Sequence, residues 1–156
     1  MNIEIFVNEG TPDILTYQEA IKFAGQAMLK KDAITPAFSQ ACIDREKQFP
    51  TGLRLADGTG IAIPHGDSNL VKKSSISFVR LIQPVSFGLM EDAKKQVECK
   101  FLFNLALAKG EQHLTMLRNL MKLFQSEEFI HDLTNLPLVD LAANLTDKLT
   151  GKEMTN

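Results

Sequence analysis

The sequence holds 156 residues, of which 44% are hydrophobic and 23% are charged. These values are typical of one globular domain, and they exclude a disordered, collagen-like or coiled-coil chain. The 17 basic and 19 acidic side chains give a formal net charge of -2, without the basic excess of nucleic-acid-binding domains. We therefore expect a single domain over residues 1–156 that binds no nucleic acid.

The first residues, MNIEIFVNEG, lack the basic start, the apolar segment and the cleavage site of a secretory signal. The most apolar run, residues 101–108, is too short to span a bilayer. Cys42 and Cys99 lie in apolar segments without metal-site spacing, which favours reduced, packed thiols. We expect a cytoplasmic protein with no segment inserted in a membrane.

The N-terminal third predicts a strand and two helices. Residues 3–7 form a short β-branched run that ends at turn residues, as a strand would. The segment TYQE has capping-box spacing, and the helical pattern behind it predicts a helix over residues 17–31. A second helix is predicted from Pro36, with Thr35 as its N-cap, to about Phe49.

The middle of the chain carries the predicted sheet. Apolar runs at residues 60–64 and 74–82 predict strands. Residues 97–108 alternate at first and then become apolar on both faces, which indicates a central strand covered by helices. Residues 83–96 contain proline, glycine and several charges, so we expect an exposed loop or a hairpin there.

The last third is helical. Apolar residues recur at helical spacing from 114 to 124, with Leu114 and Met121 on the apolar face. Ser126 has the position of an N-cap for a short helix, and residues 138–149 form a final amphipathic helix. The order of elements predicts an α/β single-domain sandwich, in which a central mixed β-sheet is flanked by helices on both faces.

His65 follows the apolar run GIAIP and precedes Gly66. Pro64 fixes the backbone and donates no hydrogen bond, while Gly66 leaves room beside the imidazole. An imidazole titrates near neutral pH, and its neutral form acts as a nucleophile or a base. The pattern also fits a half-buried histidine bonded to a nearby carbonyl, so local spacing leaves both interpretations open.

Arg45 falls on the apolar stripe of the second predicted helix, seven residues after Phe38 and three after Cys42. A cation on an inward face is costly without a partner, and a planar guanidinium suits a carboxylate or a phosphate. Two other interpretations remain. The side chain extends to water at the helix end, or it pairs with an acid such as Glu46 or Asp67.

His113 shares the predicted inward face of Leu117 and Leu120 and lies in the first turn of its helix. Free N–H groups and the helix dipole favour an anion at this end and disfavour an imidazolium. A neutral His113 that donates to a phosphate or carboxylate fits, and so does a core histidine in a capping role. His131 faces away from its apolar stripe and is expected to be exposed.

The sequence lacks the motifs of several common metal, nucleotide and catalytic sites. It contains no HExxH, CxxC, GxGxxG, GxxxxGK[ST] or GxSxG motif, so zinc, nucleotide and serine-hydrolase sites have no support. His65, His113 and Arg45 together indicate an anion site, for which neither a metal nor a cofactor is assumed.

Three short motifs follow one another along the chain. They are DREK followed by TGL within residues 44–53, GIAIPHG at 60–66, and EQHL followed by a leucine within 111–117. Together they resemble the type-2 enzyme IIA domains of the bacterial phosphoenolpyruvate-dependent sugar phosphotransferase system, the fructose/mannitol type. The segment REKQFPTG is most similar to the galactitol-type branch. The resemblance covers essentially the whole chain.

The resemblance implies a phosphotransferase. His65 would accept a phosphoryl group from the phosphohistidine of the carrier protein HPr and pass it to a cysteine of the cognate IIB protein or domain. The membrane component IIC would then carry the sugar. Arg45 would bind the phosphoryl group and His113 would stabilise it. We also expect an apolar ring around the site, including Phe87 or other residues of 83–96.

Two alternatives remain. A stand-alone regulatory relative would keep the phosphohistidine chemistry and signal through its phosphorylation state. A non-catalytic anion-binding or interaction module would keep its partner after His65→Ala and would never acquire a phosphoryl group.

Overall fold

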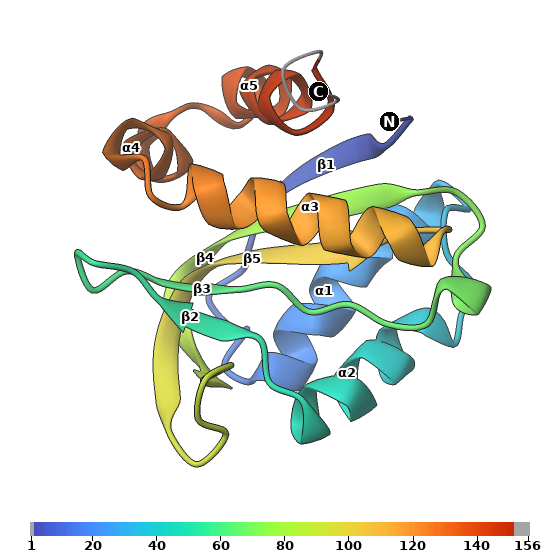
Figure 1. The fold of residues 1–156 in the computed structure, drawn as a ribbon, viewed down its shortest axis with the longest axis horizontal. Coiled ribbons are helices and arrows are strands. Elements are labelled where there is room, and N and C mark those ends of the chain that lie inside the picture. Colours follow the sequence, from blue (N-terminus) through green and yellow to red (C-terminus); the bar gives the residue numbers. More distant parts are fainter. Residues whose placement is uncertain (1, 152–156) are drawn as a thin grey trace.

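The computed structural model describes residues 2–151 (Figure 1). The elements in chain order are β1 (Glu4–Glu9), α1 (Tyr17–Lys30), α2 (Phe38–Gln48), β2 (Gly52–Arg54), β3 (Gly60–Ala62), the 3-10 turn η1 (Ser68–Leu70), β4 (Ser75–Gly88), β5 (Gln96–Ala106), α3 (Gly110–Leu123), α4 (Glu127–Asn135) and α5 (Leu138–Thr150). No helix within the described residues has the length and apolar character needed to cross a membrane.

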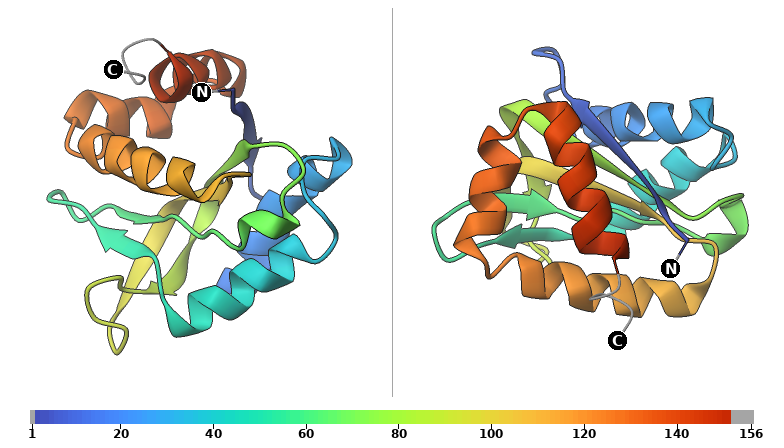
Figure 2. Two further views of the ribbon diagram at one scale, coloured as in Figure 1. Left: turned by 45° about the vertical axis from the view of Figure 1, so that its right-hand side comes forward. Right: turned by 90° about the horizontal axis from the view of Figure 1, so that it is seen from above.

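The strands form one mixed sheet in the order β1-β4-β5-β3-β2. The β1–β4 and β3–β5 pairs are parallel, whereas the β4–β5 and β2–β3 pairs are antiparallel. α1 and α2 cover one face, and α3, α4 and α5 cover the other, so that each face has its own apolar core (Figure 2). The predicted α/β sandwich, with helices on both faces of a mixed sheet, is confirmed.

The two N-terminal helices begin differently. At α1 the predicted capping box is present: the Glu19 N–H donates to the Thr16 hydroxyl (3.1 Å), and the Thr16 N–H donates to the Glu19 carboxylate (3.0 Å). α2 begins at Phe38, two residues later than predicted, and Thr35 does not cap it. The N-cap prediction is wrong because the Phe38 N–H donates to the Thr35 carbonyl (3.1 Å), which closes a turn without a side-chain acceptor.

Residues 83–96 form a hairpin, the second of the two predicted possibilities. β4 continues to Gly88 and β5 begins at Gln96, and the two strands pair in antiparallel fashion. The register shifts in the segment around Pro84, which has no N–H to give to the ladder. The connection is thereby shortened to residues 89–95.

The C-terminal helices follow the predicted patterns, with one change of face. Ser126 caps α4 as predicted, and the apolar stripe of α5 is buried. In α3 the fully buried side chains are Met116 and Leu120, whereas Leu114 is 64% and Met121 42% exposed. The predicted apolar face of α3 is therefore wrong at Leu114 and Met121, because the side that meets the sheet follows a four-residue spacing through Met116.

Candidate functional site

His65 lies just beyond the end of β3, where the chain leaves the sheet. The Pro64 carbonyl before it accepts from the Leu105 N–H (2.9 Å) and from Nδ2 of Asn104 (3.0 Å), both on β5. Asn104 is completely buried. The central strand thus fixes the peptide that precedes His65, which is the rigid strand end that the sequence predicts.

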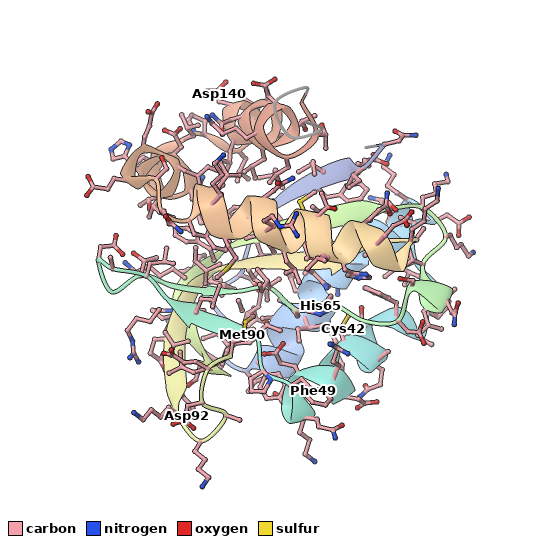
Figure 3. All side chains as sticks on the ribbon, in the orientation of Figure 1. Cys42, Phe49, His65, Met90, Asp92 and Asp140 are labelled. Carbon is pink, nitrogen blue, oxygen red and sulfur yellow. The ribbon has the colours of Figure 1, made fainter. Side chains whose placement is uncertain are left out.

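Gly66 packs against α2 on the other side of His65. An added Cβ at Gly66 would lie 3.2 Å from Sγ of Cys42, a tight contact, so a glycine lets the chain pack closely against the helix here. Figure 3 shows His65 and Cys42 as neighbours between α2 and the sheet. Both Cys42 and Cys99 are free and buried, as predicted. Burial raises the pKa of Cys42 to about 12, so its thiol stays protonated at neutral pH.

The imidazole of His65 is oriented by its own chain. Nδ1 lies 3.0 Å from the Ile63 carbonyl oxygen, and because a carbonyl only accepts, Nδ1 carries the proton in this bond. Nε2 then holds the free lone pair. Burial lowers the pKa of His65, the bond to Ile63 opposes this shift, and the charges of Arg45 and His113 add to it. The ring is therefore neutral at neutral pH.

His113 lies in the first turn of α3, as predicted, and meets His65 there. The two ring centroids are 5.5 Å apart, with an angle of 44° between the ring planes. Burial lowers the pKa of His113, a hydrogen bond to the backbone of Gly110 opposes the shift, and Arg45 adds to it. Nε2 of His113 is buried and has no hydrogen-bond partner within residues 2–151. A buried donor or acceptor of this kind is suited to a ligand.

Arg45 is exposed, so the prediction that it lies on the inward face of its helix is wrong. The buried stripe of α2 runs through Phe38, Cys42 and Glu46 at four-residue spacing, which turns Arg45 outward beside it. Its guanidinium lies 5.5 Å from the centre of the Phe49 ring, and within the described residues it makes no ion pair. The side chain therefore reaches solvent near the helix end and has no acidic partner among the described residues.

Glu46 is a buried residue of this region that the sequence analysis considered only as a partner for Arg45. It is 4% exposed, and its carboxylate accepts from the Thr51 N–H (2.6 Å) and the Thr51 hydroxyl (2.8 Å). Burial raises the pKa of Glu46 to about 7, although both bonds from Thr51 and the charge of Arg45 act in the opposite direction. A signal was available, since Glu46 follows Cys42 by four residues on the same helical stripe.

Glu46 and the two histidines give the stability of the fold opposite pH dependences. Folded Glu46 binds its proton more tightly than its ordinary value of 4.5 implies, so its contribution falls as the pH rises from about 4.5 to about 7. His65 and His113 bind protons less tightly when folded, so their contribution falls as the pH drops below their ordinary value of 6.5.

The pH dependence of Glu46 is testable with Glu46→Gln, which cannot titrate. The free energy of unfolding of the variant minus that of the wild type should increase by up to about 3 kcal/mol as the pH rises from about 5 to about 8. Urea unfolding at several pH values measures this difference. A constant difference between the two proteins across the range would contradict a raised pKa at Glu46.

The predicted apolar ring is wrong for Phe87. This side chain is 1% exposed, and its ring centroid lies 6.0 Å from that of Tyr17 on the α1 side of the sheet. Other exposed apolar side chains lie close in sequence to Arg45 and His113. Phe49, which stacks with the guanidinium, is 56% exposed, and Leu114, next after the second histidine, is 64% exposed. Met90 of the hairpin connection is 44% exposed.

The described residues bring together the neutral imidazole of His65, the imidazole of His113 and the exposed cation of Arg45 from three separate parts of the chain. Among residues 2–151 no group of three or more His, Cys, Asp and Glu side chains is placed to hold a metal ion. His131 lies on α4 and is exposed, as predicted. The arrangement suits the binding and transfer of a small, highly charged anion.

The family model described as "Phosphoenolpyruvate-dependent sugar phosphotransferase system, EIIA 2" matches residues 4–140. The chain belongs to this family. It is 32% identical over 157 residues to the mannitol-specific phosphotransferase enzyme IIA component of Enterococcus faecalis, with 99% of this chain and 92% of that protein covered. It is 30% identical over 142 residues to the galactitol-specific EIIA component of Escherichia coli strain K12, with 91% and 93% covered.

A solved complex of enzyme IIAMTL and phosphorylated enzyme IIBMTL from Escherichia coli shares the fold of this enzyme IIA. The TM-score is 0.67 at 28% sequence identity, with 96% of this chain and 95% of that chain covered. The resemblance seen in the sequence motifs is thus confirmed. This enzyme IIA is a phosphotransferase, the phosphoryl carrier of a sugar phosphotransferase system.

Proposed function

We propose that His65 is the phosphoryl acceptor of this enzyme IIA and that Nε2 is the attacking atom. The observation that carries the proposal is the bond from Nδ1 to the Ile63 carbonyl, which leaves the lone pair on Nε2. The lowered pKa of His65 keeps the ring neutral at neutral pH. A neutral imidazole nitrogen attacks without first losing a proton, so no separate base is needed.

The reaction exchanges one phosphorus–nitrogen bond for another. Nε2 of His65 attacks the phosphorus of the phosphohistidine on HPr, and the donor imidazole leaves with the electron pair of the broken bond. The ring of His65 then carries positive charge, which the Ile63 carbonyl stabilises through the Nδ1 proton. In the second transfer, a cysteine thiolate of the IIB component displaces His65 from the phosphorus. Both steps depend chiefly on in-line positioning and on charge stabilisation.

Arg45 and His113 hold the phosphoryl oxygens in this proposal. A cation–π contact at an exposed site is worth about 0.5–1 kcal/mol, so Arg45 leaves the Phe49 ring at little cost to donate two N–H groups to an anion. His113 offers its buried, unpartnered Nε2. The negative phosphoryl group favours the protonated form of His113, which donates from both ring nitrogens, and the N-terminus of α3 attracts the same charge.

The partners and the location are also proposals. HPr supplies the phosphoryl group, a IIB protein or domain receives it, and the IIC membrane component acts downstream, all from the cytoplasmic side. The mannitol- and galactitol-specific names of the relatives support a sugar alcohol as the transported compound.

A chase experiment tests this function. The protein is first charged with phosphoenolpyruvate, enzyme I and HPr, and then mixed with IIB proteins of a mannitol and a galactitol system. Intact-mass spectrometry should show the gain of one phosphoryl group and its loss on addition of the cognate IIB. A IIB whose active cysteine is replaced by serine should leave the group in place. No gain beside demonstrably charged HPr would contradict the proposal, and a gain that no IIB discharges would favour the regulatory alternative.

A further inference from the structure

Glu46 is a buried ionisable group that the proposed transfer does not use directly. Its carboxylate lies on the buried face of α2 at 4% exposure and makes no ion pair within residues 2–151. The titratable groups that influence it or respond to it are Arg45, Cys42 and Cys99. A carboxylate is costly to bury, and two hydrogen bonds from a single residue, Thr51, compensate for this cost.

Thr51 connects Glu46 to the end of β3. Its hydroxyl donates to the carboxylate (2.8 Å) and accepts from the Ile63 N–H (3.1 Å). The β2–β3 ladder ends at the pair of Gly52 and Ala62, so Ile63 carries the first N–H beyond it. Because the carboxylate takes the hydroxyl proton, a lone pair of the hydroxyl oxygen is directed to Ile63. A side chain thereby extends the ladder by one residue.

Ile63 in turn orients His65. Its N–H is held by Thr51, and its carbonyl accepts the Nδ1 proton of His65 at 3.0 Å. Hydrogen bonds and the backbone of Ile63 therefore connect the buried face of α2 to the imidazole. The residue before Glu46 is Arg45, so the same contact also fixes the helix turn that carries the cation relative to His65.

We propose that Glu46 and Thr51 are positioning residues for the phosphoryl acceptor. They fix the end of β3 so that the Ile63 carbonyl holds His65 in the tautomer with the lone pair on Nε2. The effect on transfer rests on the proposed function of His65. The tautomer itself is a property of the unphosphorylated protein and is measurable without any phosphoryl donor.

A matched pair of variants at Thr51 tests the proposal. Thr51→Val keeps the shape but removes the hydroxyl, whereas Thr51→Ser keeps the hydroxyl. Ring nitrogen shifts of His65, measured by long-range proton–nitrogen NMR correlation, report the tautomer of the folded molecules. In Thr51→Val these shifts should move toward an average of the two tautomers, and transfer from phospho-HPr should slow about 10-fold. Thr51→Ser should retain the wild-type shifts and a rate within about 2-fold of the wild type.

Two further variants distinguish the positioning role from a general loss of stability. Glu46→Gln turns one of the two acceptors of Glu46 into a donor, so it should change the His65 shifts in the same direction as Thr51→Val. Asp44→Asn, an exposed change on the same helix, should alter neither shifts nor rate. Folded Thr51→Val and Glu46→Gln with wild-type tautomer shifts would overturn the proposal. If the wild type took up no phosphoryl group, the proposed function would fail, while the tautomer shifts would still decide the positioning role.

Discussion

Replacing His65 with glutamine is expected to abolish phosphoryl uptake from phospho-HPr, down to the detection limit. Glutamine has no nucleophilic nitrogen, but its amide can donate to the Ile63 carbonyl that now accepts from Nδ1. The side chain is half-buried, so the free energy of unfolding should change by about 1 kcal/mol or less. Quenched-flow sampling of the phosphoryl group on each protein measures the uptake.

The control for this variant is His131→Gln, because His131 is exposed on α4. It should be charged at the wild-type rate. Uptake by His65→Gln at a rate close to that of the wild type would show that another residue is the acceptor. Loss of uptake in both variants would indicate a general effect of removing imidazole groups.

Replacing Arg45 with glutamine should slow uptake about 10²–10³-fold, because one preorganised cationic donor is lost from the transition state. Arg45→Lys should recover only part of the rate, since a lysine keeps the charge but cannot donate two parallel N–H groups to one anion. The exposed position of Arg45 means that stability should hardly change. Single-turnover kinetics with excess phospho-HPr measures the rate.

Lys47→Gln is the matched control for Arg45, because it removes one exposed positive charge from the last turn of the same helix. Its rate should stay within about 2-fold of the wild type if long-range charge is a small factor. Equal slowing in Arg45→Gln and Lys47→Gln would show that net charge, rather than contact with the phosphoryl group, governs the encounter with HPr.

The architecture was largely predictable because periodicity and capping act locally. The capping box at Thr16 and the N-cap at Ser126 are satisfied by atoms within a few residues, and the structure keeps both. Thr35 had the same local pattern, but a backbone turn to Phe38 took its place. The proline, glycine and charges of residues 83–96 are compatible with a loop or a hairpin, and only the pairing of β4 with β5 decides between them.

The site was less predictable, because tertiary packing decides which helix faces meet the sheet. Arg45 and Glu46 are adjacent, and each matches an apolar spacing from Phe38 or Cys42. Packing of α2 on the sheet buries Glu46 and exposes Arg45. The meeting of His65 and His113 depends on strand order, which places the end of β3 beside β5 and α3 after it. No local pattern in the sequence encodes that order.

The central claim is that the phosphoryl group is carried on Nε2 of His65. The most direct test is NMR of protein with nitrogen-15-labelled histidines, recorded before and after charging with phosphoenolpyruvate, enzyme I and HPr. The account predicts that Nε2 of His65 becomes bonded to phosphorus, while Nδ1 keeps its proton and its bond to Ile63. A phosphoryl group on Nδ1 of His65, on His113 or on His131, or none at all beside charged HPr, would contradict it.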